Sequence, residues 1–370
     1  MKKIIILCSF VLCAHAGTFK MGEITFEAGG QIVADTAWID DDGDTYHDSK
    51  FRRARAYLKG DITKFFSYEL EYSFTGKNDW KDVYLKYTGF SGWTIYAGNI
   101  KEPFGLEALT SSKYNTFMER ALADFYNSRN IGLLIKGYQK SDNDVVTYAL
   151  GGFGKSLDEA IDHKQGNSSL VGRATYAKII SKNEIYHVGL SASYTAHDKD
   201  SVKLSSDIGS SLYEGSFIKT KVKKVDYTKR VGIESAVVSG AFSFQGEYVA
   251  YAIAKQLITY NFSGWYAQAS WFLTGESRKY KAKTAVFSRV KPFNPIDKGG
   301  FGAVEVAFRV SQLDLSDKDE NGGKERDLSL DINWYLKSNL RLMAEYTYAD
   351  ELTGRSKDAN VFQLRAQYDF

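Results

Sequence analysis

The sequence is poor in several features that would place it in a common protein class. Among its 370 residues are only two cysteines and three prolines, and no apolar run reaches 18 residues. Two cysteines are too few for a disulfide-rich scaffold or a Cys-based zinc site. Scarce proline excludes a collagen-like chain, and the missing long run excludes a spanning helix. A mean hydropathy of −0.34 is also too polar for a bundle of membrane helices.

Both cysteines lie in the first sixteen residues, which have the pattern of a secretory signal peptide. A positively charged start precedes an apolar run over residues 4–13, and small residues at 14 and 16 precede a predicted cleavage before Gly17. The alternative is a lipoprotein signal that uses Cys13, but Leu12 occupies the position where such a signal has a small residue. We therefore expect residues 1–16 to be removed on export.

The exported chain is nearly neutral and has no thiol. Without residues 1–16 the formal net charge falls from +3 to +1, because Lys2 and Lys3 leave with the signal. Cysteine nucleophiles and ligands are therefore excluded, and no overall field favours nucleic acid as a partner. Any preference for anions must come from the local placement of charges.

Strict alternation of apolar and polar residues is the main positive signal. In residues 360–370, Phe362, Leu364, Ala366, Tyr368 and Phe370 share one face, and polar or charged residues dominate the other. Segments of about ten residues with this pattern and aromatic ends are typical of transmembrane β-barrels. The same pattern recurs at residues 66–74, 242–250, 302–310, 328–337 and 340–348.

The connections between these segments alternate between short and long, as in outer-membrane barrels. Tight turns are expected at residues 62–65, 90–92, 181–184, 239–241 and 338–339. Long polar loops are expected at residues 40–50, 102–130, 154–169, 196–229 and 317–326. The connection at residues 275–299 is long where a short turn is expected. The count predicts an all-β fold, a single antiparallel barrel of about sixteen strands over residues 17–370, wide enough for an aqueous channel.

Several short segments, in order along the chain, resemble the phosphate- and polyphosphate-selective porins O and P of Gram-negative outer membranes. They are residues 51–55 (FRRAR), 81–85, 98–104, 109–112, 117–120 (FMER), 273–276 with Tyr280, and 302–305 with Arg309. The resemblance implies a trimeric outer-membrane barrel whose third loop folds into the pore, with basic residues lining it. It implies small anions such as phosphate, outer-membrane lipid and two further copies of the chain as partners.

Cations cluster on one predicted lumen face. In residues 52–59, Arg53, Arg55 and Lys59 alternate with small or apolar residues. Cations on a lumen wall attract anions, and the planar fork of arginine suits phosphate. The alternative is that these are ordinary lumen charges balanced by Glu69 and Glu71 on the next strand.

The third long loop, residues 102–130, mixes apolar anchors with cations. By the family pattern, Arg120 is the candidate constriction residue, and Lys101 at the start of the loop is a second. Asp82 on the fourth strand would keep anions from binding too tightly. For Glu119 we expect a structural role as partner of Arg120 or another lumen base.

Signals for other functions are weak. The chain has neither a His-Glu-x-x-His nor a Gly-x-Ser-x-Gly motif, so we expect no enzymatic activity and no cofactor or metal. The acidic segment 40–44 has ligands suited to Ca²⁺, but a solvated loop tip explains it as well. The expected function is a channel for small anions, with phosphate or polyphosphate as candidates. A non-selective porin, a barrel enzyme and an adhesin are the alternatives.

Overall fold

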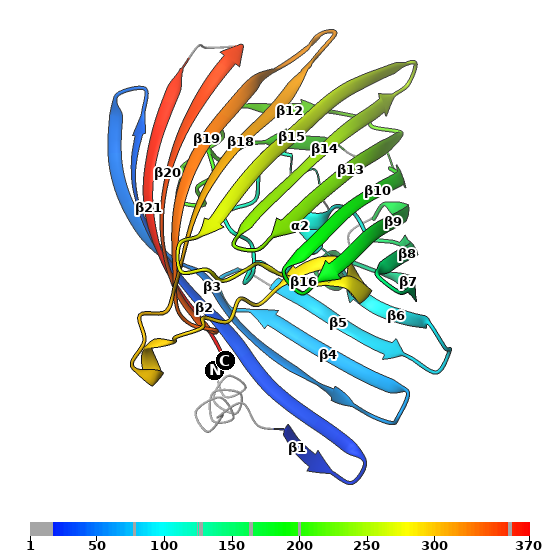
Figure 1. Cartoon of the computed structure of the whole chain (residues 1–370). Helices are drawn as coiled ribbons and strands as arrows, with labels where there is room; N and C mark the ends of the chain where they lie inside the picture. Colours follow the sequence, from blue (N-terminus) through cyan, green and yellow to red (C-terminus); the bar gives the residue numbers. More distant parts are fainter. Residues whose placement is uncertain are drawn as a thin grey trace, which may run out of the picture.

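A computed structural model describes residues 18–76, 79–123, 125, 129–162, 166–198, 201–353 and 357–370. In these residues sixteen antiparallel strands form one barrel, which closes where the first barrel strand, β2, pairs with the last, β21 (Figure 1). A short strand, β1, extends the sheet outside the ring by pairing with β2. The strands of the sheet are β1 (Thr18–Met21), β2 (Ile24–Asp41), β3 (Asp44–Asp61), β4 (Phe66–Ser73), β5 (Asp79–Tyr87), β6 (Trp93–Ile100), β7 (Asn130–Ser141), β8 (Asp144–Phe153), β9 (Ser168–Ser181), β10 (Glu184–Ala196), β13 (Tyr227–Ser239), β14 (Phe242–Lys255), β15 (Ile258–Phe272), β18 (Ala303–Asp317), β19 (Glu320–Lys337), β20 (Leu340–Thr353) and β21 (Asp358–Asp369).

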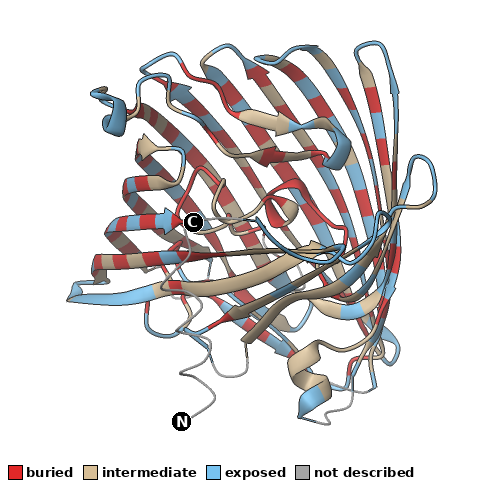
Figure 2. Ribbon diagram, turned by 90° about the horizontal axis from the view of Figure 1, so that it is seen from below, coloured by how far each residue is buried: buried red, intermediate tan, exposed pale blue. Residues whose placement is uncertain are grey.

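The burial pattern is the inverse of a soluble protein's. On β21, Phe362 and Tyr368 are each 43% exposed, whereas Gln363 and Arg365 are 1% and 3% exposed. Figure 2 shows the same alternation of buried and exposed residues around the barrel. An apolar outer surface and a polar interior are what a barrel in lipid requires, so the predicted fold class is confirmed. In the described part of the chain, no helix is long and apolar enough to cross a membrane.

All five predicted tight turns connect neighbouring strands, but two predicted long loops are wrong. Residues 40–50 and 317–326 belong to the hairpins β2–β3 and β18–β19, whose strands continue to two-residue turns at 42–43 and 318–319. The first turn is tight because Asp42 and Gly43 adopt φ values of 54° and 91°. Polar residues dominate the ends of both hairpins, which is why they looked like loops. The predicted signal peptide lies outside the described residues.

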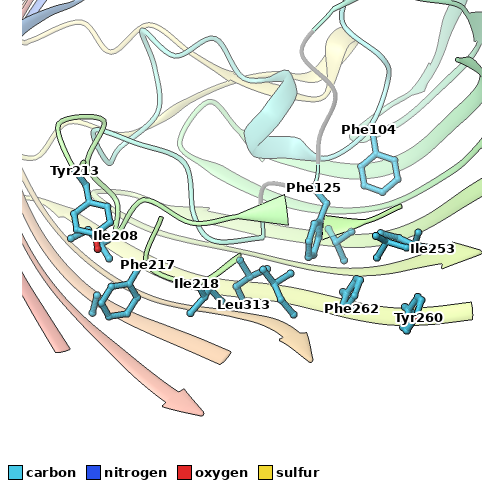
Figure 3. Packing of buried hydrophobic residues seen from close by; sticks show 14 of the residues in the cluster. Phe104, Phe125, Ile208, Tyr213, Phe217, Ile218, Ile253, Tyr260, Phe262 and Leu313 are labelled. Atoms are coloured by element: carbon cyan, nitrogen blue, oxygen red, sulfur yellow. The ribbon is translucent and has the colours of Figure 1, made fainter. Parts of the chain in front are cut away.

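Two long loops fold into the lumen, where one had been predicted. Residues 101–129 contain the short helix α2 (Leu106–Leu109), and residues 197–226 contain the hairpin β11 (Val202–Ser205) and β12 (Lys219–Val222). Their apolar side chains pack together with the inner faces of the barrel strands (Figure 3). Buried members of this cluster include Phe104 and Phe125 from the first loop, Ile208 and Phe217 from the second, and Leu313 from β18.

The long connection between β15 and β18 also folds into the barrel, which accounts for its length. It forms the small hairpin β16 (Lys279–Lys281) and β17 (Val286–Ser288), with the 3₁₀ turns η1 (Ala282–Thr284) and η2 (Ile296–Lys298). The Tyr280 hydroxyl lies 2.7 Å from Nδ1 of the lumen residue His187, and Arg173 donates to the carbonyl of Ala285. The amide of Phe287 donates to Thr110 at the end of α2. The third loop is therefore contacted by the connection between β15 and β18, which enters from the end of the barrel that has the short turns.

Candidate functional site

The third loop, residues 101–129, is fastened to the barrel where it enters the lumen. Glu102 is paired with Arg230 of β13 at 2.9 Å. The carboxylate of Glu247, on β14, accepts the first amides of α2, those of Leu106 and Glu107, at 2.8 and 2.7 Å. Because buried backbone amides need acceptors, this carboxylate fixes the position of the helix.

The loop then crosses to the wall of β18, β19 and β20, where charged side chains bind its backbone. Glu345 accepts the amide of Met118 at 2.8 Å. Arg341 donates to the carbonyls of residues 115 and 116, and Arg309 donates to that of Glu119. We call this the covered wall, because its charged residues are at most 3% exposed: Glu305, Arg309, Glu325, Asp327, Asp331, Arg341 and Glu345.

A β-bulge in β3 directs two consecutive arginines into the lumen. In the pairing with β2, Val33 lies opposite Arg53 and Ala34 lies opposite Phe51, so Arg52 is the extra residue. Phe51 is 64% exposed on the outer surface, whereas Arg52 and Arg53 both reach Glu119 inside the barrel. Bulges re-aim side chains in this way. Strict alternation through β3 would place Arg52 on the lipid side, and the bulge turns it inward instead.

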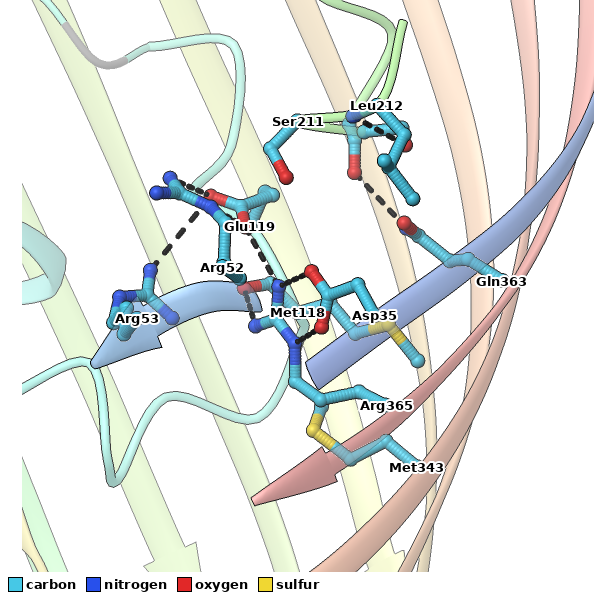
Figure 4. A network of polar contacts seen from close by, with 12 residues as sticks. Asp35, Arg52, Arg53, Met118, Glu119, Ser211, Leu212, Met343, Gln363 and Arg365 are labelled. Carbon is cyan, nitrogen blue, oxygen red and sulfur yellow. Dashed lines mark hydrogen bonds and ion pairs between the residues drawn. The ribbon is translucent and has the colours of Figure 1, made fainter. Parts of the chain in front are cut away.

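Glu119 is the centre of an arginine cluster (Figure 4). Its carboxylate accepts two hydrogen bonds from Arg52, at 2.7 and 2.9 Å, and one from Arg365 of β21, at 2.7 Å. Arg53 lies 3.8 Å away. Burial alone would raise the pKa of Glu119, but the charges of Arg52, Arg365 and Arg53 hold it well below its usual range. Glu119 is thus an ionised partner of lumen bases, which include Arg52 and Arg365.

A second charged cluster lies beside the first. Arg129 is paired with Asp82 at 2.6 Å and lies 3.6 Å from Glu71, which is also 3.6 Å from Arg55. Lys101 donates to the carbonyl of Ala108 at 2.6 Å, and Arg120 approaches the same carbonyl at 3.4 Å. Burial, followed by repulsion from Arg120 and Arg129, holds the pKa of Lys101 well below its usual value.

A polar cavity of about 460 Å³ lies between the two inward loops, next to the arginine cluster. Its charged lining residues are Arg52, Arg53, Glu119, Arg120 and Asp207. In the described residues, Nη1 of Arg53 is buried without a hydrogen-bond partner. A buried guanidinium nitrogen with no acceptor is a donor to which an anion could bind.

The structure brings together five of the six predicted site residues. Arg53 and Arg120 line the cavity, while Arg55, Lys101 and Asp82 belong to the adjoining charged cluster. Lys59 does not join them, because it is 39% exposed and paired with Glu27 at 2.8 Å. Of the two acids proposed to balance this face, Glu71 does approach Arg55, while Glu69 accepts the hydroxyl of Tyr84.

The prediction missed Arg52, Arg129 and Arg365. Alternation on the last strand does place Arg365 on the lumen face, and Arg129 lies within the third loop, so both could have been found. Arg52 could not, because the bulge that turns it inward has no signal in the local sequence. In the described residues no group of three or more acidic or histidine side chains is placed to hold a metal ion, and segment 40–44 lies at a tight hairpin turn.

Comparison with known proteins identifies the family. The model of the family "Phosphate-selective porin O and P" matches residues 26–370. Porin O of Pseudomonas aeruginosa is 28% identical over an alignment that covers 94% of this chain and 89% of the relative. The fold is similar to that of the outer-membrane protein OmpT of Vibrio cholerae, with a TM-score of 0.61 at 11% identity, over 96% of this chain and all of the other. An anion-selective porin from Comamonas acidovorans gives a TM-score of 0.56 at 14% identity, over 94% and 100%. The chain belongs to the family of phosphate-selective porins O and P, and it is a β-barrel protein of the outer membrane.

Proposed function

We propose that this porin is a channel that prefers small anions, with phosphate as the first candidate, and we assign it no enzymatic activity. The observation that carries the proposal is the arrangement of charge around the cavity. Three arginines (Arg52, Arg53 and Arg120) border the cavity against two acids (Glu119 and Asp207), whereas the acids of the covered wall are buried and do not line it. A chain of almost zero net charge can therefore present a positive surface to a permeating ion.

Phosphate fits this site by its chemistry. Arginine donates paired hydrogen bonds to phosphate oxygens, and Nη1 of Arg53 has no acceptor in the described residues. The family name and the match to Porin O support the same ligand class. We further propose a homotrimer, as the resemblance implies; a trimer form of Vibrio cholerae OmpT shares the fold with a TM-score of 0.57.

The test is single-channel recording in planar bilayers under a KCl gradient. We expect a reversal potential with the sign of the chloride equilibrium potential, and partial block of the chloride current by phosphate. A reversal potential near zero would favour the alternative of a non-selective porin, and the opposite sign would overturn the proposal. A heat-sensitive oligomer band on a denaturing gel tests the trimer separately.

A further inference from the structure

The carboxylate of Glu119 occupies the centre of the arginine cluster beside the cavity. It lines the cavity, and it is held as an arginine site would hold a free oxyanion. Arg52 donates two parallel hydrogen bonds to it, Arg365 donates one more, and Arg53 lies 3.8 Å away. Bidentate arginine pairs are among the strongest hydrogen-bonded contacts to carboxylate and phosphate. We call Arg52, Arg53 and Arg365 the cradle.

Part of the cradle is held in place without Glu119. Arg365 donates two hydrogen bonds of 2.7 Å to Asp35 of β2 and a third to the carbonyl of Met118. The bulge in β3 directs Arg52 and Arg53 inward through the backbone. Glu119 is also anchored by its own backbone, because Arg309 donates to its carbonyl at 3.0 Å. Removing the side chain would therefore leave three arginines around the vacated space, with Arg365 still fixed by Asp35.

We propose that Glu119 is a tethered substitute for a permeating anion, which fills an arginine-lined oxyanion site of the pore and so keeps the channel from being blocked by its own ions. The inference rests on the proposed function, since it assumes that anions reach the cavity. A pore needs sites that bind weakly enough to release the ion, and three converging arginines would retain an oxyanion. With the cradle filled, a permeating ion meets only the remaining donors, among them Nη1 of Arg53.

The variant Glu119→Ala tests this directly, because it removes a CH₂–COO⁻ group, which has nearly the size and shape of acetate. The emptied cradle should then bind acetate or phosphate from solution. We expect the half-blocking concentration of each for the chloride current to fall by about tenfold or more relative to the unchanged protein, as a new bidentate contact would give. In the unchanged protein, acetate should block weakly because the cradle is filled.

Two matched variants separate the cradle from a general gain of positive charge. Glu119→Gln removes the charge but leaves the space filled, so it should raise the anion preference without creating the acetate site. Glu71→Ala removes an acid that faces Arg55 and Arg129 outside the cavity lining, so it should leave acetate block unchanged. Tight acetate block in Glu71→Ala, or none in Glu119→Ala, would overturn the proposal.

A second measurement does not depend on conductance. In detergent, acetate should raise the midpoint of thermal unfolding of Glu119→Ala and leave that of the unchanged protein as it was, because a ligand stabilises only the folded state that binds it. A folded Glu119→Ala protein without this shift refutes the substitute-anion role. If the unchanged channel prefers anions while Glu119→Ala binds no acetate, the proposed function stands and this inference alone fails. If the unchanged channel prefers cations, both fail.

Discussion

Two parts of the lumen carry charge, and they use it differently. On the covered wall, five acids and two arginines are at most 3% exposed, and Glu345, Arg309 and Arg341 bind the backbone of the third loop. Around the cavity, three arginines face two acids, and one of those acids, Glu119, is already paired. The net charge calculated from the sequence counts both sets, whereas a permeating ion meets the charges around the cavity and not those of the covered wall. Net charge is therefore a poor guide to the selectivity of such a pore.

The largest effect is expected from removing Arg365, which joins Glu119 to Asp35 on β2. Arg365→Met would remove the arginine that pairs with the buried Asp35, and it would leave Glu119 with Arg52 and Arg53 only. We expect the free energy of unfolding to fall by about 3–5 kcal/mol, as when one partner of a buried pair is removed. Urea unfolding of the barrel in lipid vesicles measures it.

Arg326→Met is the control for this loss. Its partner Asp350 lies 3.3 Å away, and the two side chains are 43% and 29% exposed. An exposed pair contributes about 0–1 kcal/mol, so the control should be nearly as stable as the unchanged protein. Equal losses in the two variants would contradict the account.

The second prediction concerns the anchor of α2. Glu247→Ala would leave the amides of Leu106 and Glu107 without their acceptor. Each buried amide left without an acceptor costs about 1–3 kcal/mol, so we expect a looser third loop and larger open-channel current noise. Glu247→Gln keeps one acceptor oxygen and should show a smaller change. Quiet, unchanged currents in Glu247→Ala would show that this carboxylate does not position the loop.

Much of this architecture follows from the sequence, and much of the charge arrangement does not. Alternation in residues such as Phe362 to Tyr368 predicts the strands, because each side chain meets either lipid or lumen. The covered wall could not be predicted, since Asp331 and Arg53 are both lumen-facing charges in the sequence. Only the paths of the two inward loops and of residues 275–299 determine which lumen charges are shielded.

A third prediction uses pH. The pKa of Lys101 lies well below its usual value, so this residue loses its charge at a lower pH than an ordinary lysine with a pKa of about 10.4. Arginines keep their charge, so the anion preference should decline as the pH rises through that lower range. Lys101→Met should flatten the profile. A profile of the same shape in both proteins would show that Lys101 does not act on permeating ions.

The smallest effect is expected at Lys59, which lies on the same strand as Arg53. It is 39% exposed and paired with the equally exposed Glu27, away from the cavity. Lys59→Met should leave the reversal potential unchanged and the stability within about 1 kcal/mol. A clear loss of anion preference would extend the functional region to the end of β3.

Position, not number, decides which lumen charges act on ions. This is measured by comparing the reversal potentials of Arg120→Gln and Glu305→Gln in one KCl gradient. Arg120 lines the cavity, whereas Glu305 is fully buried in the covered wall. We predict that Arg120→Gln lowers the chloride-to-potassium permeability ratio by about tenfold, because one charge about 6 Å away in water changes the local concentration of each ion by about threefold in opposite directions. Glu305→Gln should leave the ratio unchanged. A shift in Glu305→Gln as large as that in Arg120→Gln would show that the buried charges act on ions as well.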